Sequence, residues 1–167
     1  MIPTIETDRL LLLPPDSSCF DLYEEFYTDA EASAAYGGPT SSARARARLK
    51  EDICSWSVCG FGVWVIQDKA SKSLLGCCGF WQGEGWPREL TWWLLPQMRG
   101  KGYAREASLA AVSYAYDDFG WEKVETYMED SNQAAKVLVQ RLGGECTRRD
   151  DFPDGLSRDV YLIPQPR

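Results

Sequence analysis

The stretch that most constrains the fold runs from Gln97 to Ala107 and reads QMRGKGYAREA. It follows an apolar run that ends in Pro96, and its two glycines, Gly100 and Gly102, precede a segment whose apolar residues have helical spacing. A strand that passes through a glycine turn directly into a helix is typical of sites where backbone N–H groups at a helix N-terminus bind an anion. The stretch therefore predicts an α/β fold with an anion-binding turn in mid-chain.

The charges around the two glycines favour a bound anion over an empty turn. Arg99, Lys101 and Arg105 place three cations at the predicted helix N-terminus, where the helix dipole stabilises acids and disfavours bases. This arrangement is unfavourable unless an anion such as a pyrophosphate occupies the turn. The alternative is a solvent-exposed glycine turn whose basic side chains extend into water.

Two nucleotide-binding motifs do not fit this stretch. A P-loop requires G-x-x-x-x-G-K-[ST], and no such lysine–hydroxyl pair occurs here. A dinucleotide fingerprint requires G-x-G-x-x-G, and Arg105 holds the position of the third glycine. The stretch also lies after several predicted strands rather than in a first β-α-β unit. A nucleotide-binding regulator is therefore disfavoured.

Apolar periodicity and turn residues divide the chain into one α/β domain, residues 1–167, with no repeats and no linker. The predicted strands are 9–15, 61–68, 73–82, 88–96, 122–128 and two that flank 149–159. The predicted helices are 16–28, one that contains Leu49, Ile53 and Trp56, one that ends near Phe119, and one from 130–132 to Gly143. Strand 88–96, the next helix and strand 122–128 form a β-α-β crossover, which is expected to be right-handed with near-parallel strands.

Composition argues against several classes of function. The 167 residues carry a net charge of −7, which argues against nucleic-acid binding. No apolar run reaches the roughly 20 residues of a membrane helix, and the N-terminus lacks the pattern of a signal peptide, so we expect a cytoplasmic protein with no membrane partner. The six cysteines include no C-x-x-C pair and are expected to be reduced thiols that mostly pack in the core, without a metal site.

The absence of histidine limits the chemistry further. With 0 histidines, the chain has no histidine base, histidine proton shuttle or histidine-ligated metal. A general base must therefore be a carboxylate, a tyrosine, a lysine, a thiolate or a water molecule.

The central stretch and its flanks resemble a known family. Gln97, Gly100 and Gly102 fill the pattern Q-x-x-G-x-G/A, and with the following YAREA they resemble motif A of the GNAT acyl-CoA N-acetyltransferases. The segments TDRLLLLPP, ELTWWLLP and DSNQAAKVLVQRLGG resemble the branch that acetylates the N-termini of ribosomal proteins. The resemblance covers nearly the whole chain. It implies the GNAT fold, a mixed and mostly antiparallel sheet of about six to seven strands, splayed between the fourth and fifth, with about four helices.

The resemblance also implies acetyl-CoA as co-substrate and a set of residues that hold it. The pantetheine arm is expected along the strand that ends at Pro96, the pyrophosphate against backbone amides from Arg99 to Ala104, and Asn132 facing the pantetheine. A plain helix cap is the other role open to Asn132. The residues implied to bind acetyl-CoA are Trp93, Leu94, Leu95, Gln97, Arg99, Gly100, Lys101, Gly102, Tyr103, Ala104 and Asn132.

Glu89 is the candidate general base. Strand alternation places Glu89, Thr91 and Trp93 on one face, and the resemblance implies a carboxylate base at the start of this strand, acting directly or through water. The alternative is a strand-end carboxylate paired with Arg88 or Arg9.

Two further catalytic groups are needed, a donor that stabilises the oxyanion and an acid that protonates the leaving thiolate. The backbone N–H of Leu94 or Leu95 is expected to stabilise the oxyanion, since Pro96 has no N–H. Relatives carry a serine or a tyrosine as general acid where this chain has Ala135 and Val139, neither of which can donate a proton. Tyr103 and Tyr127 are further candidates, with core packing as the alternative for each.

The acceptor site is expected, by the same resemblance, between residues 33–42 and 148–159. Aromatic residues are plentiful there and acids are available for a cationic acceptor, although solvated loop acids are the usual case. The residues concerned are Tyr36, Trp81, Trp86, Phe152, Asp150, Asp151 and Asp154. The arginines of 43–50, ARARARLK, have i, i+2 spacing and are expected to spread over a solvated helix face.

These observations predict an acetyl-CoA-dependent N-acetyltransferase. The expected acceptor is a primary amine, on a small molecule or a peptide N-terminus, which attacks directly in a ternary complex. A monomer or a homodimer is expected. The alternative is a non-catalytic acyl-CoA-binding sensor module, which the missing acid at Ala135 and Val139 favours.

Overall fold

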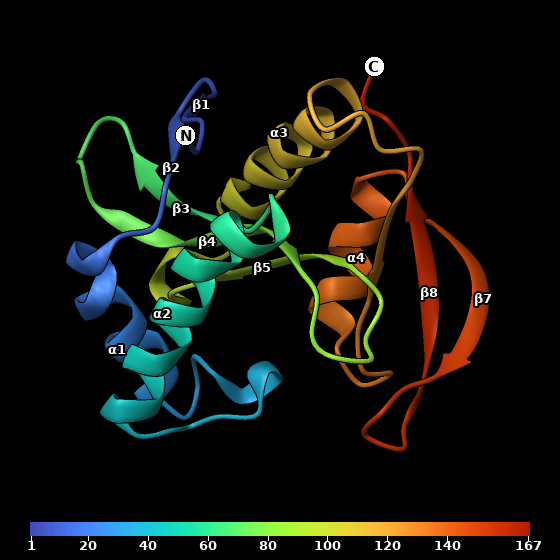
Figure 1. Cartoon of the computed structure of the whole chain (residues 1–167), viewed down its shortest axis with the longest axis horizontal. Helices are drawn as coiled ribbons and strands as arrows, with labels where there is room; N and C mark the ends of the chain where they lie inside the picture. The colour runs from blue at the N-terminus through green and yellow to red at the C-terminus, as the bar shows by residue number, and fades with distance from the viewer.

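The computed structural model describes all 167 residues and has four α-helices and eight strands in antiparallel sheets (Figure 1). The strands are β1 (Ile5–Glu6), β2 (Leu10–Leu13), β3 (Val63–Asp68), β4 (Leu74–Trp81), β5 (Glu89–Leu94), β6 (Val124–Tyr127), β7 (Glu145–Asp151) and β8 (Ser157–Ile163). The helices are α1 (Phe20–Thr28), α2 (Ser42–Cys59), α3 (Tyr103–Asp117) and α4 (Gln133–Arg141). Short 3-10 turns are η1 (Ser17–Cys19), η2 (Ala34–Tyr36) and η3 (Pro96–Met98).

The strands form two separate sheets. The first has the order β1-β2-β3-β4-β5 and the second the order β6-β8-β7. Every predicted helix and strand is present, and the additional strand is β1, whose two residues are too short for a periodic signal. The chain has eight strands rather than the six to seven expected. The expected crossover β5–α3–β6 joins two sheets instead of two strands of one sheet.

The implied splay lies between β5 and β6, which are the fourth and fifth strands if the short β1 is left out. Side-chain bonds hold the two sheets together near the start of β5: Thr126 Oγ1 donates to the carbonyl of Leu90 at 2.8 Å, and the Tyr127 hydroxyl donates to the carbonyl of Pro87 at 2.8 Å. Further along, β5 has no strand partner on this side. The main-chain edge of its second half is therefore left open.

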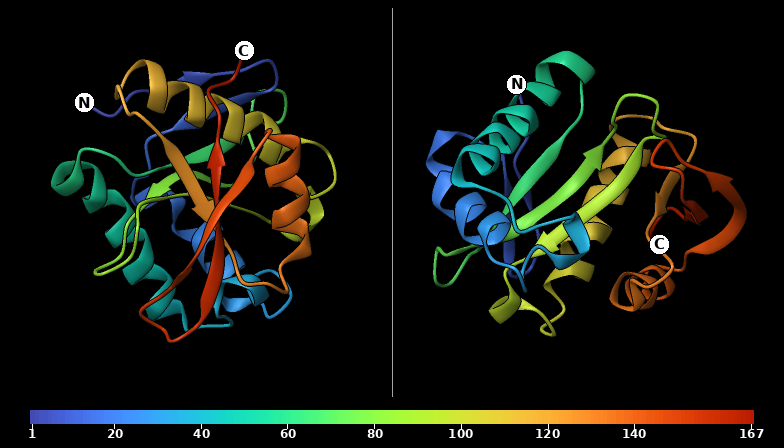
Figure 2. Two further views of the ribbon diagram at one scale, coloured as in Figure 1. Left: turned by 90° about the vertical axis from the view of Figure 1, so that its right-hand side faces the viewer. Right: turned by 90° about the horizontal axis from the view of Figure 1, so that it is seen from below.

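Two apolar clusters cover opposite faces of the first sheet. One joins α3 and α4 to the face that includes Leu90 and Leu94, and the other joins α1 and α2 to the face that includes Trp93; Figure 2 shows α1 and α2 on one side and α3 on the other. The ring of Trp93 stacks on that of Phe26 with centroids 4.0 Å apart. The predicted alternation of β5 is thus confirmed.

All six cysteines are free, as expected of reduced thiols. The expectation that they mostly pack holds for the buried half, Cys19, Cys77 and Cys78, with the last two in opposite clusters. It is wrong for the exposed thiols of Cys54, Cys59 and Cys146. None of the helices combines the length and apolarity that crossing a bilayer requires.

Candidate active site

The gap between β5 and β6 opens into a cleft of about 860 Å³. Its walls come from β5, the turn between η3 and α3, η2, β6 and one side of α4 along its whole length. Most of the residues predicted to form the site line it, namely Glu89, Trp93, Leu94, Arg99, Gly100, Gly102, Tyr103, Ala104 and Asn132. The predicted residues that do not line it are Leu95, Gln97 and Lys101.

The pairing of β5 with β4 decides which of its backbone groups face the cleft. The N–H of Leu95 donates to the carbonyl of Leu75 at 2.9 Å, and Leu94 pairs with Gly76. Because hydrogen-bonded and non-bonded pairs alternate along an antiparallel ladder, the N–H and C=O of Trp92 and Leu94 point away from β4, into the cleft. The assignment of Leu95 as an oxyanion donor is corrected, since its N–H is already bonded.

The open edge of β5 is partly covered by η2. The Tyr36 hydroxyl donates to the carbonyl of Trp92. The Tyr36 ring packs edge-on against that of Phe26, with the ring centroids 5.6 Å apart. The main-chain groups of Leu94, one residue pair further along, face the cleft without that cover. They are the β5 groups best placed to bind a ligand in this cleft.

The turn before α3 has the backbone shape that its glycines allow. Gly100 and Gly102 both have left-handed backbones, with φ of +77° and +83°, a conformation that other residues rarely adopt. Gly102 is the N-cap of α3 and provides no side-chain bond to the first turn. A Cβ atom at Gly100 would meet nothing within 4 Å. The first N–H groups of α3 are therefore open for an anion, as the sequence predicts.

The basic residues of the turn do not share one role. Arg99 donates from Nη2 to the carbonyl of Ala32 at 2.9 Å, which ties the turn to the segment before η2. Lys101 and Arg105 are exposed and have no carboxylate partner among the ion pairs of the chain. Gln97 turns toward α1, where its Nε2 donates to Glu25 at 3.3 Å. The positive charges of Lys101 and Arg105 therefore remain uncompensated at the turn. Gln97 instead links the turn to α1.

An ion pair missed from the sequence anchors this turn. Arg9 Nε donates to Glu106 Oε1 at 2.7 Å, and Arg9 Nη1 donates to the carbonyl of Lys101 at 3.0 Å. The guanidinium also lies 4.5 Å from the centre of the Tyr103 ring. The position of Glu106 in the first turn of the predicted helix could have indicated a structural role at this turn, because acids stabilise helix N-termini. The alternative pairing of Arg9 with Glu89 is wrong.

The ionisation of Glu106 should make the stability of the protein depend on pH. Partial burial opposes ionisation, but hydrogen bonds from the Thr7 hydroxyl and from Arg9 outweigh it and lower the pKa of Glu106. A lowered pKa adds stability above the unfolded pKa of about 4.3, and this stability is lost as pH falls through the folded pKa. We expect Glu106→Gln to cost about 1–2 kcal/mol at pH 7 and much less at pH 3, measured by chemical denaturation.

Glu122→Gln is the matched control for this prediction, since Glu122 is exposed and has no ion pair. It should change stability by less than about 0.5 kcal/mol at either pH. An equal loss for Glu106→Gln at both pH values would show that its ionisation is not involved.

Glu89 lies at the start of β5, half-buried, opposite Trp81 of β4. Burial raises the pKa of Glu89 to about 8, although the positive charges of Arg48 and Arg158 oppose that rise. The guanidinium of Arg88, the other alternative partner, lies over the Trp121 ring at 3.4 Å. The Glu89 carboxyl has no ion-pair partner, lines the cleft and has a pKa of about 8, which makes it a candidate general base.

The acids expected to bind the acceptor instead bind other residues of the β7–β8 hairpin. Asp150 pairs with Arg148 at 2.7 Å, Asp154 pairs with Arg158 at 2.6 Å, and Asp151 accepts a hydrogen bond from the Ser157 hydroxyl. The acids that do line the cleft are Glu31, Glu89 and Glu129. Of the expected aromatic residues, Tyr36 and Trp86 line it, whereas Trp81 and Phe152 do not.

Asn132 is a helix cap that also lies at the cleft. Its side-chain oxygen accepts from the N–H of Ala135 at 3.2 Å, which caps α4, and the residue also lines the cleft. Ala135 and Val139 are buried against the core. The Tyr127 hydroxyl is committed to Pro87, and the Tyr103 ring packs under Arg9. The general acid therefore stays unassigned.

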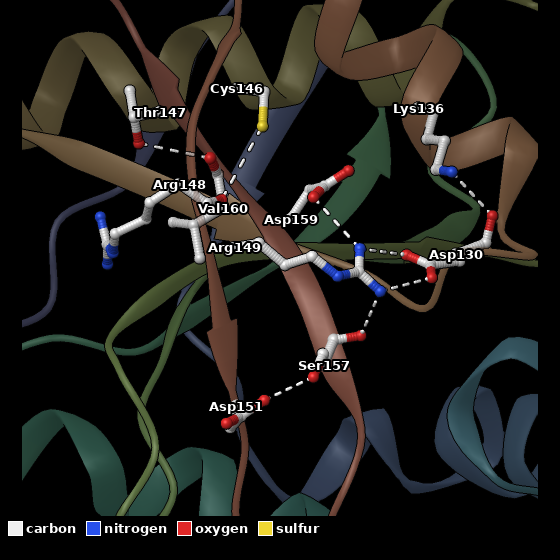
Figure 3. Close-up of polar contacts among 10 residues, drawn as sticks. All are labelled: Asp130, Lys136, Cys146, Thr147, Arg148, Arg149, Asp151, Ser157, Asp159 and Val160. Atoms are coloured by element: carbon white, nitrogen blue, oxygen red, sulfur yellow. Dashed lines mark hydrogen bonds and ion pairs between the residues drawn. The ribbon is translucent and has the colours of Figure 1, made fainter.

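The loop before Asn132 is fixed from the second sheet. Arg149 of β7 donates to both carboxylate oxygens of Asp130, at 3.1 and 2.7 Å, and to Asp159 at 3.1 Å (Figure 3). Lys136 Nζ of α4 donates to the carbonyl of Asp130 at 2.7 Å. The β7–β8 hairpin therefore holds the N-terminus of α4 at the wall of the cleft.

Comparison with known proteins identifies the arrangement. The model of the "Acetyltransferase (GNAT) domain" family matches residues 9–145. The uncharacterized N-acetyltransferase YoaA of Bacillus subtilis (strain 168) is 24% identical over 176 residues, covering 100% of this chain and 99% of YoaA. A crystal structure of the acetyltransferase from Agrobacterium tumefaciens str. C58 has a TM-score of 0.89 and 26% identity, covering 99% of this chain and 96% of that one.

More distant structures share the fold. The ribosomal L7/L12 α-N-protein acetyltransferase RimL has a TM-score of 0.75 at 16% identity, over 97% of this chain and 94% of its own. The microcin C7 self-immunity acetyltransferase MccE, in complex with acetyl-CoA and AMP, has a TM-score of 0.71 at 13% identity, over 93% and 92%. The splayed sheets, the glycine turn and the family match agree, and the chain belongs to the GNAT family of acetyltransferases.

Proposed function

We propose that the protein is an N-acetyltransferase that moves an acetyl group from acetyl-CoA to a primary amine. One observation carries the proposal: a single cleft brings together the open main-chain edge at Leu94, the uncapped N-terminus of α3 and the ionisable Glu89. The first two suit the pantetheine and pyrophosphate of an acyl-CoA, and the third suits an amine acceptor. The acetyl-CoA complex of MccE, which has the same fold, supports this choice of donor.

The residues of the cleft can be assigned to steps in the transfer. The amides that follow Gly100 and Gly102 bind the pyrophosphate, while Arg105 and Lys101 add positive charge nearby. The C=O of Leu94 accepts a hydrogen bond from the pantetheine arm, and its N–H stabilises the oxyanion. Asn132 presents its remaining amide donors to the cleft.

Glu89 takes the proton of the incoming ammonium group, directly or through a water molecule, so that the neutral amine attacks the thioester carbonyl. The carbon–nitrogen bond forms first and gives a tetrahedral oxyanion, and the second nitrogen proton passes to water. Collapse of this intermediate breaks the carbon–sulfur bond, and CoA leaves as a thiolate. No side chain at Ala135 or Val139 can donate to the leaving sulfur. Water is the proton source that the proposal uses.

The alternative function is a sensor that binds acyl-CoA without catalysis. The absence of a proton donor at the two family positions favours it. The raised pKa of Glu89 favours the enzyme, because a merely structural carboxylate is usually paired with a base and ionised well below neutral pH. Catalysis is therefore favoured over acyl-CoA sensing as the function of the cleft.

We expect a panel of primary amines to separate the two functions. The protein is incubated with acetyl-CoA and either small amines or peptides with free N-termini, and products are followed by mass spectrometry. Mass detection is preferable to a thiol reagent because the exposed Cys54, Cys59 and Cys146 would react with the reagent. Acetylation of at least one amine class above the rate without protein is the expected result.

The control for this experiment is acetyl-CoA with protein and no amine, which measures hydrolysis alone. Binding of acetyl-CoA with no product from any amine across the panel would favour the sensor and contradict the enzyme. The panel also distinguishes small-molecule amines from peptide N-termini as the acceptor class.

A further inference from the structure

The three arginines at the start of α2 have different environments. Arg44 pairs with Glu51 at 3.3 Å on the surface, and Arg46 lies over the Phe20 ring at 3.9 Å. Arg48 instead turns toward the sheet, with its side chain only 24% exposed and its guanidinium carbon 5.4 Å from the centre of the Trp81 ring. The expectation of a solvated face is therefore wrong for Arg48.

The position of Arg48 places a positive charge beside the candidate base. Trp81 of β4 is the residue directly opposite Glu89 of β5. Glu89 shares a face of β5 with Trp93, which packs against α1 and α2. Arg48, over Trp81 on the same face, therefore lies at the end of the sheet where Glu89 begins its strand.

A buried network fixes Arg48 in this place. Arg48 Nε donates to Asp52 Oδ1 at 3.2 Å, and the Tyr23 hydroxyl donates to Asp52 Oδ2 at 2.6 Å. Asp52 is 4% exposed, Tyr23 is fully buried, and the thiol of Cys77 lies 3.4 Å from the Tyr23 hydroxyl. Both terminal nitrogens of Arg48 are left without a hydrogen bond to the protein. Asp52 thus orients the guanidinium through one nitrogen only.

A buried ion pair of this kind needs a reason beyond stability. Replacing such a pair with apolar residues of similar size is often neutral or stabilising, and the surroundings of Tyr23 and Asp52 already form an apolar cluster of aromatic and aliphatic residues. Because the terminal nitrogens of Arg48 have no hydrogen bond to the protein, its positive charge is available to a nearby anionic group.

We propose that Asp52 and Tyr23 hold Arg48 at the start of β5 so that its positive charge stabilises the ionised carboxylate of Glu89. Arg48, Asp52 and Tyr23 are positioning residues in this proposal, which rests on the proposed function of Glu89 as base. No covalent step is added.

The other groups that face Glu89 cannot replace Arg48. Arg158 of β8 also carries a positive charge, but it is paired with Asp154 at 2.6 Å and lies 3.8 Å from Glu129. The hydroxyls of Tyr36 on η2 and Tyr127 on β6 have pKa values raised by burial, and both stay neutral. Among the charges that favour ionised Glu89, that of Arg48 has the largest effect.

The test removes the charge of Arg48 without leaving Asp52 buried and unpaired. In the double variant Arg48→Met with Asp52→Asn, an amide still accepts the Tyr23 hydrogen bond. We expect the pKa of Glu89 to rise by about one unit, so that kcat/KM falls about tenfold at pH 7 and recovers toward the wild-type value at high pH. The acetyl-CoA-induced rise in melting temperature should not change.

The matched control is Arg46→Met, which removes an arginine two residues away that lies over Phe20 instead. Its pH profile should equal that of the wild type. If the double variant does not fold, Arg48→Lys retains the ion pair but draws the charge back toward Asp52, and a smaller shift in the same direction is expected. An unchanged profile, or a loss of rate that is equal at all pH values, would overturn the proposal.

A direct titration separates this inference from the proposed function. The carboxyl carbon of Glu89, labelled with ¹³C and assigned with Glu89→Gln, is followed by NMR over pH in the wild type and the double variant. A higher midpoint in the double variant supports the positioning role even if no amine is acetylated, and equal midpoints overturn it even in an active enzyme.

Discussion

Replacing Gly102 with glutamate is expected to abolish the stabilisation of the protein by acetyl-CoA. At a concentration 100 times its Kd, a ligand raises the stability of the folded state by about 2.7 kcal/mol, which for a domain of this size corresponds to roughly 5–10 °C in Tm. The new carboxylate would lie at the N-terminus of α3, where the pyrophosphate is proposed to bind. It would compete with the ligand for the same N–H groups and repel its charge.

Two controls separate charge from backbone strain in this experiment. Gly102→Ala imposes the same left-handed strain, at φ of +83°, without a charge, and should retain part of the acetyl-CoA shift. Gly120→Glu adds a carboxylate at a left-handed glycine with φ of +68° and open space around it, outside the cleft, and should retain all of it. A full shift in Gly102→Glu would contradict the pyrophosphate site.

The turn and its helix could be predicted because their causes are local. A strand before Pro96, helical spacing after Gly102 and three cations at or near the turn all lie close together in the sequence. The same holds for Asn132, whose capping bond reaches only three residues along the chain. Motifs of this kind are determined by neighbours in the sequence, so the structure agrees with them.

The correct oxyanion donor could not be chosen from the sequence. Alternation identifies the faces of β5, but the edge to which an N–H points depends on the register with β4. The bond from Leu95 to Leu75 joins residues that are far apart in sequence. Only this non-local pairing distinguishes Leu94 from Leu95.

The charged neighbours of Glu89 could not be predicted from the sequence for a related reason. The spacing of Arg46 and Arg48 shows that they leave α2 in different directions, but it does not show which direction meets the sheet. That depends on how α2 packs over β4, which brings Arg48 to Trp81. The acids of 150–154 illustrate the converse, since their partners Arg148 and Arg158 lie close in sequence and withdraw them from the cleft.

Replacing Glu89 with glutamine is expected to lower kcat/KM by a factor on the order of 10²–10⁴ at pH 7, the usual contribution of a positioned general base. Glutamine has nearly the same shape but cannot take a proton. In the wild type the base works only when ionised, so activity should rise with pH through about 8, where Glu89 titrates, and then level off. With an alkyl amine the variant should lose the inflection near pH 8 and rise only as the amine itself loses its proton, while acetyl-CoA still raises its melting temperature.

Glu84→Gln is the control, since Glu84 is exposed in the turn before β5 and does not line the cleft; its rate should be that of the wild type. The choice of acceptor sharpens the test further. An alkyl amine with a pKa of about 10 arrives protonated at pH 7 and depends on the base, whereas an aromatic amine of low pKa arrives neutral. The loss in Glu89→Gln should therefore be large for the alkyl amine and small for the aromatic one. Equal rates for wild type and variant with the alkyl amine at every pH would remove Glu89 as the base and leave water as the proton acceptor.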